Sequence, residues 1–132
     1  MAIEIVDVTG LARDVKKRKV IMNTRKMHAW EHYLAEPGDH TDMHCHPGDQ
    51  TFMVLEGECT MRFPDGGESV MKPGVVALIE GGSFYQLVNT HDGPTVLMGT
   101  RTGPNAANQH INHETRENTR APSDREAKVL GV

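Results

Sequence analysis

Two histidines, His44 and His46, are separated by a single residue and stand shortly before an apolar run at residues 51–55. In a β-strand, residues i and i+2 point to the same face, so the two imidazoles project side by side. Neutral imidazole is a common ligand of divalent transition metals, so the pair predicts a metal site, although a histidine on a strand can also be an ordinary core residue. Cys45, between them, points to the opposite face and is predicted to be a buried thiol.

The residues around this pair follow a longer pattern. It consists of a glycine, five residues, the H-x-H pair, three residues, a polar residue, six residues and a second glycine, represented here by Gly38, His44, His46, Gln50 and Gly57. This pattern resembles the first signature of the cupin family, which usually has glutamate where this chain has Gln50. The resemblance extends over residues 28–100.

A second, weaker signature of the same family occurs further along the chain. At the family spacing it is represented by five residues: Gly74, Glu80, Gly82, Tyr85 and Asn89. The family usually has proline at the position of Glu80 and histidine at the position of Tyr85. The resemblance therefore implies a divalent metal, with Mn, Fe, Zn and Ni as the candidate ions. The implied ligand positions are His44, His46, Gln50 and Tyr85.

Gln50 is the informative departure from the family pattern. A glutamine supplies a neutral carbonyl oxygen where glutamate would supply a negative charge, so the cation stays more electrophilic. This favours Lewis-acid chemistry, in which the metal polarises a carbonyl group or acidifies bound water, over the oxygen activation typical of two histidines and a carboxylate. Cupins with the H-x-H-x3-Q pattern include manganese-dependent lyases, which points the same way. The alternative is a decayed site with no metal.

Tyr85 allows three interpretations. Its oxygen can bind the metal as phenolate, because a nearby cation lowers the pKa of the phenol. It can instead be a general acid or base beside a metal held by three ligands, or a core tyrosine with a hydrogen-bonded hydroxyl. Other possible pocket groups, able to orient an anionic substrate or move protons, are His28, His32, His40, Arg62 and Arg101. Glu80 is a candidate base in the loop before Tyr85, a position more typical of a solvated side chain.

Short apolar segments separated by turn residues position these side chains. The pattern predicts strands at residues 3–8, 20–23, 28–35, 51–55, 59–63, 68–71, 75–79, 84–88 and 95–100. Short strands at this even spacing are typical of an all-β sandwich or barrel, and the cupin resemblance selects the double-stranded β-helix, or jelly-roll barrel. The segment at 75–79 is expected to be buried and that at 3–8 to be an edge strand. Residues 11–19 are expected to form a solvated turn or short helix.

Three parts of the chain differ in character. Residues 1–27 are predicted to form an N-terminal arm or strand, residues 28–103 the barrel, and residues 104–132 a polar tail. The tail is rich in charged residues and asparagine, and is therefore expected to be partly disordered, with a short helix near residues 109–118. His110 and His113 would lie one turn apart on that helix, as solvated side chains.

Composition sets limits on partners and location. The chain has 132 residues, 37% of them apolar, which suffices for the core of one small domain. A formal net charge of −4 argues against a nucleic-acid partner, and the lack of an apolar run of about 18 residues argues against a membrane span. Two cysteines are too few for a disulfide framework, so free thiols and a cytoplasmic location are expected. The resemblance implies a homodimer, formed by packing sheets or by exchanging the strand at residues 3–8.

Two classes of function fit these observations. The first is a metal-dependent enzyme that acts on a small polar or carbonyl-bearing substrate by lyase or isomerase chemistry, with dioxygenase chemistry as the alternative because it is widespread among cupins. The second is a non-catalytic module that binds a small ligand and has lost its metal. A stoichiometric metal in the purified protein would favour the enzyme, and an empty interior or a bound organic molecule would favour the module.

Overall fold

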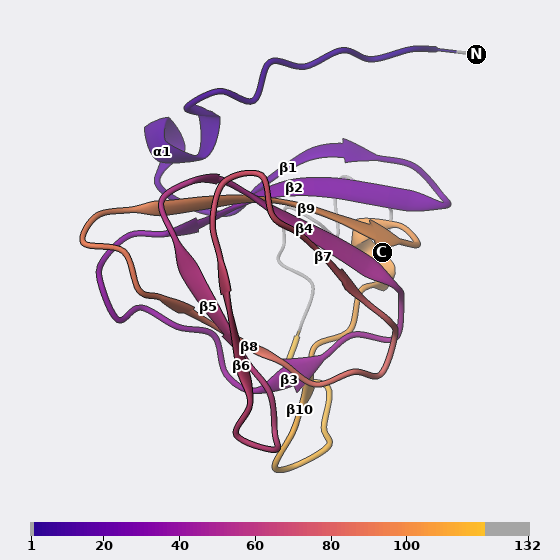
Figure 1. Cartoon of the computed structure of the whole chain (residues 1–132). Coiled ribbons are helices and arrows are strands. Elements are labelled where there is room, and N and C mark those ends of the chain that lie inside the picture. Colours follow the sequence, from indigo (N-terminus) through magenta and orange to yellow (C-terminus); the bar gives the residue numbers. More distant parts are fainter. Residues whose placement is uncertain (1, 121–132) are drawn as a thin grey trace.

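Strands account for most of the regular structure of the chain. The computed structural model describes residues 2–120 and contains two sheets that face each other and a two-stranded ribbon (Figure 1). The predicted all-β, double-sheet architecture is therefore confirmed. The elements in chain order are α1 (Leu11–Val15), β1 (Lys19–Asn23), β2 (Met27–Leu34), β3 (His44–Cys45), β4 (Gln50–Glu56), β5 (Cys59–Arg62), β6 (Glu68–Met71), β7 (Val76–Ile79), β8 (Gln86–Asn89), β9 (Thr95–Thr102), a 3-10 turn at Asn105–Ala107, and β10 (Ile111–Asn112).

The larger sheet contains five antiparallel strands in the order β1-β2-β9-β4-β7. Successive residues of a strand face opposite ways, so each strand turns every second side chain to the interior. On the three central strands, the register aligns inward residues in rows across the sheet. Two of these rows are His28–Arg101–Gln50 and Trp30–Gly99–Phe52. The pairing thus places a polar row next to an aromatic row inside the molecule.

Gly99 makes room for the indole of Trp30 in the aromatic row. A Cβ atom added at residue 99 would lie 2.5 Å from Cζ2 of Trp30, closer than side chains tolerate. Trp30 is fully buried and packs edge-to-face against Phe52, with ring centroids 5.5 Å apart. A larger residue at 99 would therefore displace the indole and disturb both rows.

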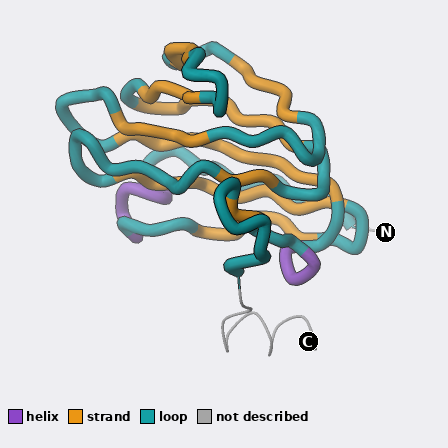
Figure 2. The backbone as a smooth tube through the Cα atoms, turned by 90° about the horizontal axis from the view of Figure 1, so that it is seen from below, coloured by secondary structure: helices purple, strands orange, loops and turns teal. Residues whose placement is uncertain are grey.

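The smaller sheet contains β6, β5 and β8 in that order and supplies the other side of the core. Its buried residues Cys59, Met61 and Leu87 join the same hydrophobic cluster as the aromatic row. Burying one such large aliphatic or aromatic side chain contributes about 1.5–3 kcal/mol, so this cluster is the main source of stability. Cys45 and Cys59 are both free, as predicted; Cys45 is also buried, as predicted, and so is Cys59. Seen from below, the strands run side by side across the molecule and the loops gather at their ends (Figure 2).

Two predictions about the edges of the fold were wrong. The sequence predicts a buried strand at residues 75–79, but β7 is an edge strand of the larger sheet. Val76 and Leu78 are 61% and 69% exposed. The prediction failed because an apolar run does not reveal whether a strand has a second neighbour or a covered outer face. Residues 3–8 have no strand partner among the described residues; they extend from the sheets as an arm on which Ile3 and Ile5 are exposed (Figure 1).

β10 brings the described part of the C-terminal segment back to the sandwich. It pairs antiparallel with β3, with Ile111 opposite Cys45 and Asn112 opposite His44. Residues 104–113 are therefore mostly buried or half-buried, which corrects the exposed tail predicted for this stretch, while residues 114–119 are exposed.

The short helix expected near residues 109–118 is replaced by β10 and a turn. Oδ1 of Asn112 accepts hydrogen bonds from the backbone N–H groups of Glu114 and Thr115, at 2.9 and 3.0 Å. Local side-chain bonds of this kind compete with the helical pattern, which explains why the helix does not form. The disorder predicted for the end of the tail concerns residues 121–132, which lie outside the described residues.

The short helix expected within residues 11–19 is present as α1. It packs on the outer face of β2, where the backbone N–H of Ala12 donates to the carboxylate of Glu31. No helix in residues 2–120 combines the length and the apolar character that a membrane crossing requires.

Candidate metal centre

His44 and His46 come together as their spacing predicts. His44 begins β3, His46 comes directly after that strand, and both residues are buried. Their ring centroids are 4.8 Å apart and their ring planes meet at 84°. Two backbone hydrogen bonds between His44 and Tyr85, of 3.0 and 2.9 Å, fix this segment in the interior.

Each of these histidines has one ring nitrogen held by a backbone carbonyl. Nδ1 of His44 donates to the carbonyl oxygen of Asp42, and Nδ1 of His46 to that of Gln109, both at 2.7 Å. A carbonyl oxygen can only accept, so the proton lies on Nδ1 and the lone pair on Nε2. This is the arrangement that metal-binding histidines commonly have, because the second hydrogen bond fixes both the tautomer and the ring orientation.

Burial keeps both imidazoles neutral. It lowers the pKa of His44 to about 4 and, together with the positive charge of Arg101, lowers the pKa of His46 to about 2. An unperturbed histidine has a pKa of about 6.5. Both side chains therefore hold the neutral form, which is the form that binds metal, at physiological pH.

A third histidine, His110, joins the pair from the segment just before β10. Its ring stacks on that of His44, with centroids 3.8 Å apart and planes 8° from parallel, and its centroid lies 5.6 Å from that of His46. Potential ligand nitrogens of the three residues lie within 4.8 Å of one another. Nε2 of His110 donates to Oδ1 of Asp42 at 2.6 Å, which leaves Nδ1 as the potential ligand.

Asp42 stays charged beside this cluster. Burial alone would raise the pKa of its carboxyl group, but the hydrogen bonds from His110 and Asn112 outweigh burial and hold the pKa below its usual value. The carboxylate also accepts from Nδ2 of Asn112 at 3.1 Å. It therefore orients His110 in the way that carboxylates orient metal-binding histidines.

The donor set fits a divalent transition metal, with one adjustment. A metal lies close to the plane of each imidazole that binds it, at about 2.0–2.1 Å from the nitrogen in the case of zinc. The nearly perpendicular rings of His44 and His46 can meet this condition for a single ion. The stacked rings of His44 and His110 cannot, because parallel planes share no point, so His110 must tilt to become a third ligand.

Gln50 and Tyr85 are joined by a hydrogen bond in the interior. Oε1 of Gln50 accepts from Nε of Arg101 at 2.6 Å, and its Nε2 donates to the hydroxyl oxygen of Tyr85 at 2.6 Å. Arginine has no acceptor, so the contact with Arg101 fixes which end of the amide faces Tyr85. The oxygen that the sequence assigns to the metal is thus engaged by Arg101, and Gln50 and Tyr85 as metal ligands stay a prediction.

The same contacts restrict the hydrogen bonding of the Tyr85 hydroxyl group. Its oxygen accepts from Gln50, so its own hydrogen must be donated to another group. Burial raises the pKa of Tyr85 to about 12, although hydrogen bonding from Gln50 and the charge of Arg101 act in the opposite direction. Tyr85 is therefore a neutral phenol at physiological pH, and its ring centroid lies 4.6 Å from that of His44.

The other pocket groups predicted from the sequence divide into two sets. Three lie in the interior: His28, His32 and Arg101. Three are exposed: His40, Arg62 and Glu80. Arg62 forms a surface ion pair with Glu68 at 3.5 Å, so it takes no part in the histidine cluster.

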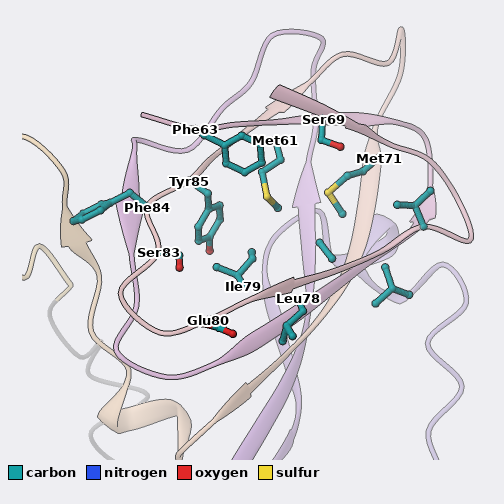
Figure 3. A pocket seen from close by; sticks show the side chains of 13 residues that line it. Met61, Phe63, Ser69, Met71, Leu78, Ile79, Glu80, Ser83, Phe84 and Tyr85 are labelled. Carbon is teal, nitrogen blue, oxygen red and sulfur yellow. The ribbon is translucent and has the colours of Figure 1, made fainter. Parts of the chain in front are cut away.

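Two spaces meet at Tyr85. The polar cavity, of about 360 Å³, is lined by the three histidines and by Arg18, Arg101 and Arg120. The apolar groove, of about 460 Å³, lies between β7 on one side and β5 and β6 on the other (Figure 3). Its lining includes the side chains of Met61, Met71 and Ile79. Tyr85 lines both spaces, so it separates a polar environment from an apolar one.

His110 is the site residue that sequence reasoning missed, because the histidines of the predicted tail were interpreted as solvated. One signal was available: Ile111 is the only large aliphatic residue in residues 104–128. An isolated apolar residue in a polar segment can mark the point where that segment docks. Here Ile111 pairs with Cys45, next to both histidines of the motif.

Comparisons with known proteins identify a family. A family model described as a cupin domain matches residues 31–100. A comparison with curated proteins gives no match. The match spans the motif histidines, Gln50 and Tyr85, but it ends before His110.

Three solved structures illustrate the similarity of fold. One, from Klebsiella pneumoniae subsp. pneumoniae, is described as a conserved protein with a double-stranded β-helix domain; it is 24% identical, covers 70% of this chain and 81% of its own, and has a TM-score of 0.62. A protein from Thermus thermophilus is 28% identical, covers 77% and 98%, and has a TM-score of 0.64. A DMSP lyase from Ruegeria pomeroyi is 16% identical, covers 71% and 46%, and has a TM-score of 0.59.

Proposed function

Because this chain belongs to the cupin superfamily, we propose that it is a metal-dependent enzyme that acts on a small polar or carbonyl-bearing substrate. One observation carries the proposal. Two buried neutral histidines, His44 and His46, each keep an unprotonated Nε2 near Tyr85, a phenol whose oxygen accepts from Gln50 and whose own hydrogen is therefore directed to another acceptor. Burying so many polar groups costs free energy, and such clusters of perturbed groups are typical of functional sites.

His44 and His46 would hold the metal, and His110 would complete the set after its ring tilts. Mn, Fe, Zn and Ni are the candidate ions. A bound divalent ion would act as a Lewis acid, polarising a carbonyl group or acidifying water. The cluster found among the described residues consists of histidines alone, which favours this chemistry over the oxygen activation of sites with two histidines and a carboxylate.

The side chains around the cluster would perform the proton transfer. Tyr85 would donate its proton to a substrate oxygen that gains negative charge during the reaction. Gln50 donates a hydrogen bond to the phenol oxygen and the positive charge of Arg101 acts on it, so the two would orient the phenol and stabilise the phenolate that is left. Lyase and isomerase reactions at a carbonyl or hydroxyl group need such a proton donor. The lyase description of the Ruegeria pomeroyi protein is a property of that protein, and it is compatible with this chemistry on the same fold.

Metal content gives the direct test. We expect about one equivalent of divalent metal per chain in the purified protein by mass spectrometric elemental analysis. The variant His91→Ala, which removes a surface histidine remote from the cluster, should keep it. A screen of small hydroxy acids, cyanohydrins and diketones with the metal-loaded protein would then search for turnover.

The alternatives give different results in the same experiments. Oxygen consumption during the screen would favour dioxygenase chemistry. A protein that takes up none of the four candidate ions when they are added in excess would contradict the proposed enzyme and favour the non-catalytic binding module.

The proposed assembly is a homodimer in the cytoplasm. Ile5, in the N-terminal arm, is 93% exposed, and Leu78 lies exposed on the edge strand β7. Apolar side chains in such positions favour contact with a second copy of the chain. Light scattering coupled to size-exclusion chromatography would measure the mass, and a monomer at micromolar concentration would contradict the dimer.

A further inference from the structure

Arg101 is a buried cation that contacts neutral groups. It is 5% exposed, its Nε donates to Oε1 of Gln50 at 2.6 Å, and Nη1 lies 3.4 Å from Nε2 of His28. Its guanidinium also contacts the hydroxyl of Tyr85 and lies 4.2 Å from the ring centroid of Trp30. No carboxylate among residues 2–120 forms an ion pair with it.

Arg101 remains charged in this environment. Burial lowers the pKa of its guanidinium to about 10, which is still well above physiological pH. His28 cannot share the charge, because its Nδ1 lies 2.9 Å from the carbonyl oxygen of Gly103 and burial lowers its pKa to about 4. A buried charge of this kind is normally paired or bound to an ion.

The polar cavity surrounds this cation with further positive charge. Arg18 and Arg120 line the same space, and no aspartate or glutamate does so among the described residues. The imidazoles of His44 and His46 are neutral and offset none of the charge. Arg101, whose described partners are all neutral, is therefore the cation in this lining that can attract a ligand of the opposite charge.

Two kinds of hydrogen-bond donor in the cavity have capacity for such a ligand. A guanidinium carries five N–H bonds, and the contacts with Gln50, His28 and Tyr85 engage about three of them. Nε1 of Trp30 is a buried donor with no acceptor among the described residues, and Trp30 lines the same cavity. An oxyanion beside Arg101 would satisfy donors that the protein leaves without acceptors.

We propose that Arg101 binds the carboxylate of the substrate, which makes the substrate a small hydroxy or keto acid. Two remaining N–H bonds of a planar guanidinium match the two oxygens of a carboxylate. The polar cavity, of about 360 Å³, has room for a compact acid of this kind. The inference rests on the proposed function for the other end of the molecule, where the hydroxyl or carbonyl group would face Tyr85 and the histidines.

Trp30 provides a reporter for binding, because it is the only tryptophan of the chain and lies against Arg101. Metal is first removed with a chelator, so that binding does not depend on the ion. Glycolate and its neutral counterpart glycolamide are then titrated while tryptophan fluorescence is followed. A charge-assisted bidentate contact predicts a dissociation constant at least about tenfold lower for glycolate.

Three arginine variants assign the effect. Arg101→Gln should lose the preference for glycolate, Arg101→Lys should retain it in weaker form, and Arg62→Gln, which removes an exposed arginine outside the cavity, should bind as the parent protein does. Thermal unfolding checks that each variant is folded. If Arg101→Gln does not fold, the comparison of glycolate with glycolamide on the unaltered protein still tests whether the cavity prefers a carboxylate.

Several results would overturn the inference. They are equal binding of glycolate and glycolamide, an unchanged preference in a folded Arg101→Gln variant, or tighter binding of inorganic phosphate than of glycolate. Metal content is measured separately on the same samples. A protein that prefers glycolate but takes up no metal would contradict the proposed function alone, and a metal-loaded protein without the preference would contradict this inference alone.

Discussion

The polar cavity and the apolar groove share one sandwich and one residue, Tyr85, yet they are built differently. The groove lies between strand edges, its buried lining is made of side chains such as Met61 and Met71, which need no hydrogen-bond partners, and its polar lining residues Ser69, Glu80 and Ser83 are exposed to solvent. The polar cavity is lined by imidazoles and guanidinium groups that are held by hydrogen bonds and ring contacts. The contrast indicates that burial on the apolar side stabilises the fold, while the buried polar groups on the other side cost stability, as expected for the proposed site.

The distribution of unsatisfied polar atoms supports this contrast. Among the described residues, the buried side-chain atoms without a hydrogen-bond partner are Trp30 Nε1, Glu31 Oε1 and Asn108 Oδ1. Trp30 and Asn108 line the polar cavity, and none of the three residues lines the apolar groove. Unsatisfied buried groups cost about 1–3 kcal/mol each, so they are most easily explained where a ligand satisfies them.

The largest effect is expected from the double variant His44→Ala/His46→Ala. It should abolish metal binding, because it removes both proposed ligands whose orientation is already fixed, and it should leave the protein folded, because the stabilising cluster lies elsewhere. Elemental analysis and circular dichroism would measure the two outcomes. Unfolding of the metal-free double variant would show that the site is structural, and would break the contrast between the two spaces.

Tyr85→Phe should keep the metal and lower the rate of turnover by about 10² to 10⁴, because the proton donor is removed. Tyr33→Phe, which alters the partly buried tyrosine on the outer face of β2, is the matched control and should be neutral. Metal titration and single-turnover kinetics with a substrate from the screen would measure both. Loss of metal affinity in Tyr85→Phe would instead identify the tyrosine as a ligand, as the sequence alone allows.

Met71→Ala tests the apolar side. It should lower the free energy of unfolding by about 2–5 kcal/mol, since it leaves a cavity in the core, and it should leave metal content unchanged. Urea unfolding measures the first effect and elemental analysis the second. Loss of metal in a folded Met71→Ala protein would show that the two spaces are coupled through Tyr85.

Gln50→Glu should keep or tighten metal binding, if the new carboxylate reaches the metal, and lower turnover about tenfold or more. The carboxylate would pair with Arg101 and accept a hydrogen bond from the hydroxyl of Tyr85, so it would neutralise the buried positive charge and engage the hydrogen that Tyr85 is proposed to donate. The glycolate preference should therefore weaken as well. A variant that is more active than the parent would contradict the advantage proposed for a neutral amide.

The smallest effect concerns pH. In the metal-free protein the pKa values of His44 and His46 are lowered to about 4 and about 2, while in the unfolded chain they return to about 6.5. Between about pH 6.5 and 4 the unfolded chain binds protons that the folded protein excludes, so stability falls as pH falls. Replacing both residues by alanine should make this fall shallower in urea unfolding at pH 7 and pH 5, while His28 and His32, whose pKa values burial also lowers to about 4, should keep part of it. An equally steep fall in the double variant would assign it to other groups.

The sequence was most informative where the chemistry lies within one short stretch. The i, i+2 spacing of His44 and His46 gives them a common face wherever the segment is extended, as it is here, and the turn residues delimit most strands. Which strands pair with one another, and in which register, cannot be predicted from such local patterns. The exposure of Val76 depends on β7 having one strand neighbour, and the position of His110 depends on β10 pairing with β3. The contact between Arg101 and Gln50 likewise results from a strand register that no local pattern contains.

The short pairing of β10 with β3 has a consequence for how such sites diversify. The match to the cupin-domain model ends at residue 100, so His110 belongs to a C-terminal extension that lies outside the matched domain. Insertions, deletions or replacements in that extension would change the third imidazole without altering any residue of the matched domain. A related protein can therefore keep the domain fold and the two motif histidines without keeping the third histidine. A survey of metal preferences among proteins of this kind should be sorted by the segment on the C-terminal side of the domain as well as by the motif inside it.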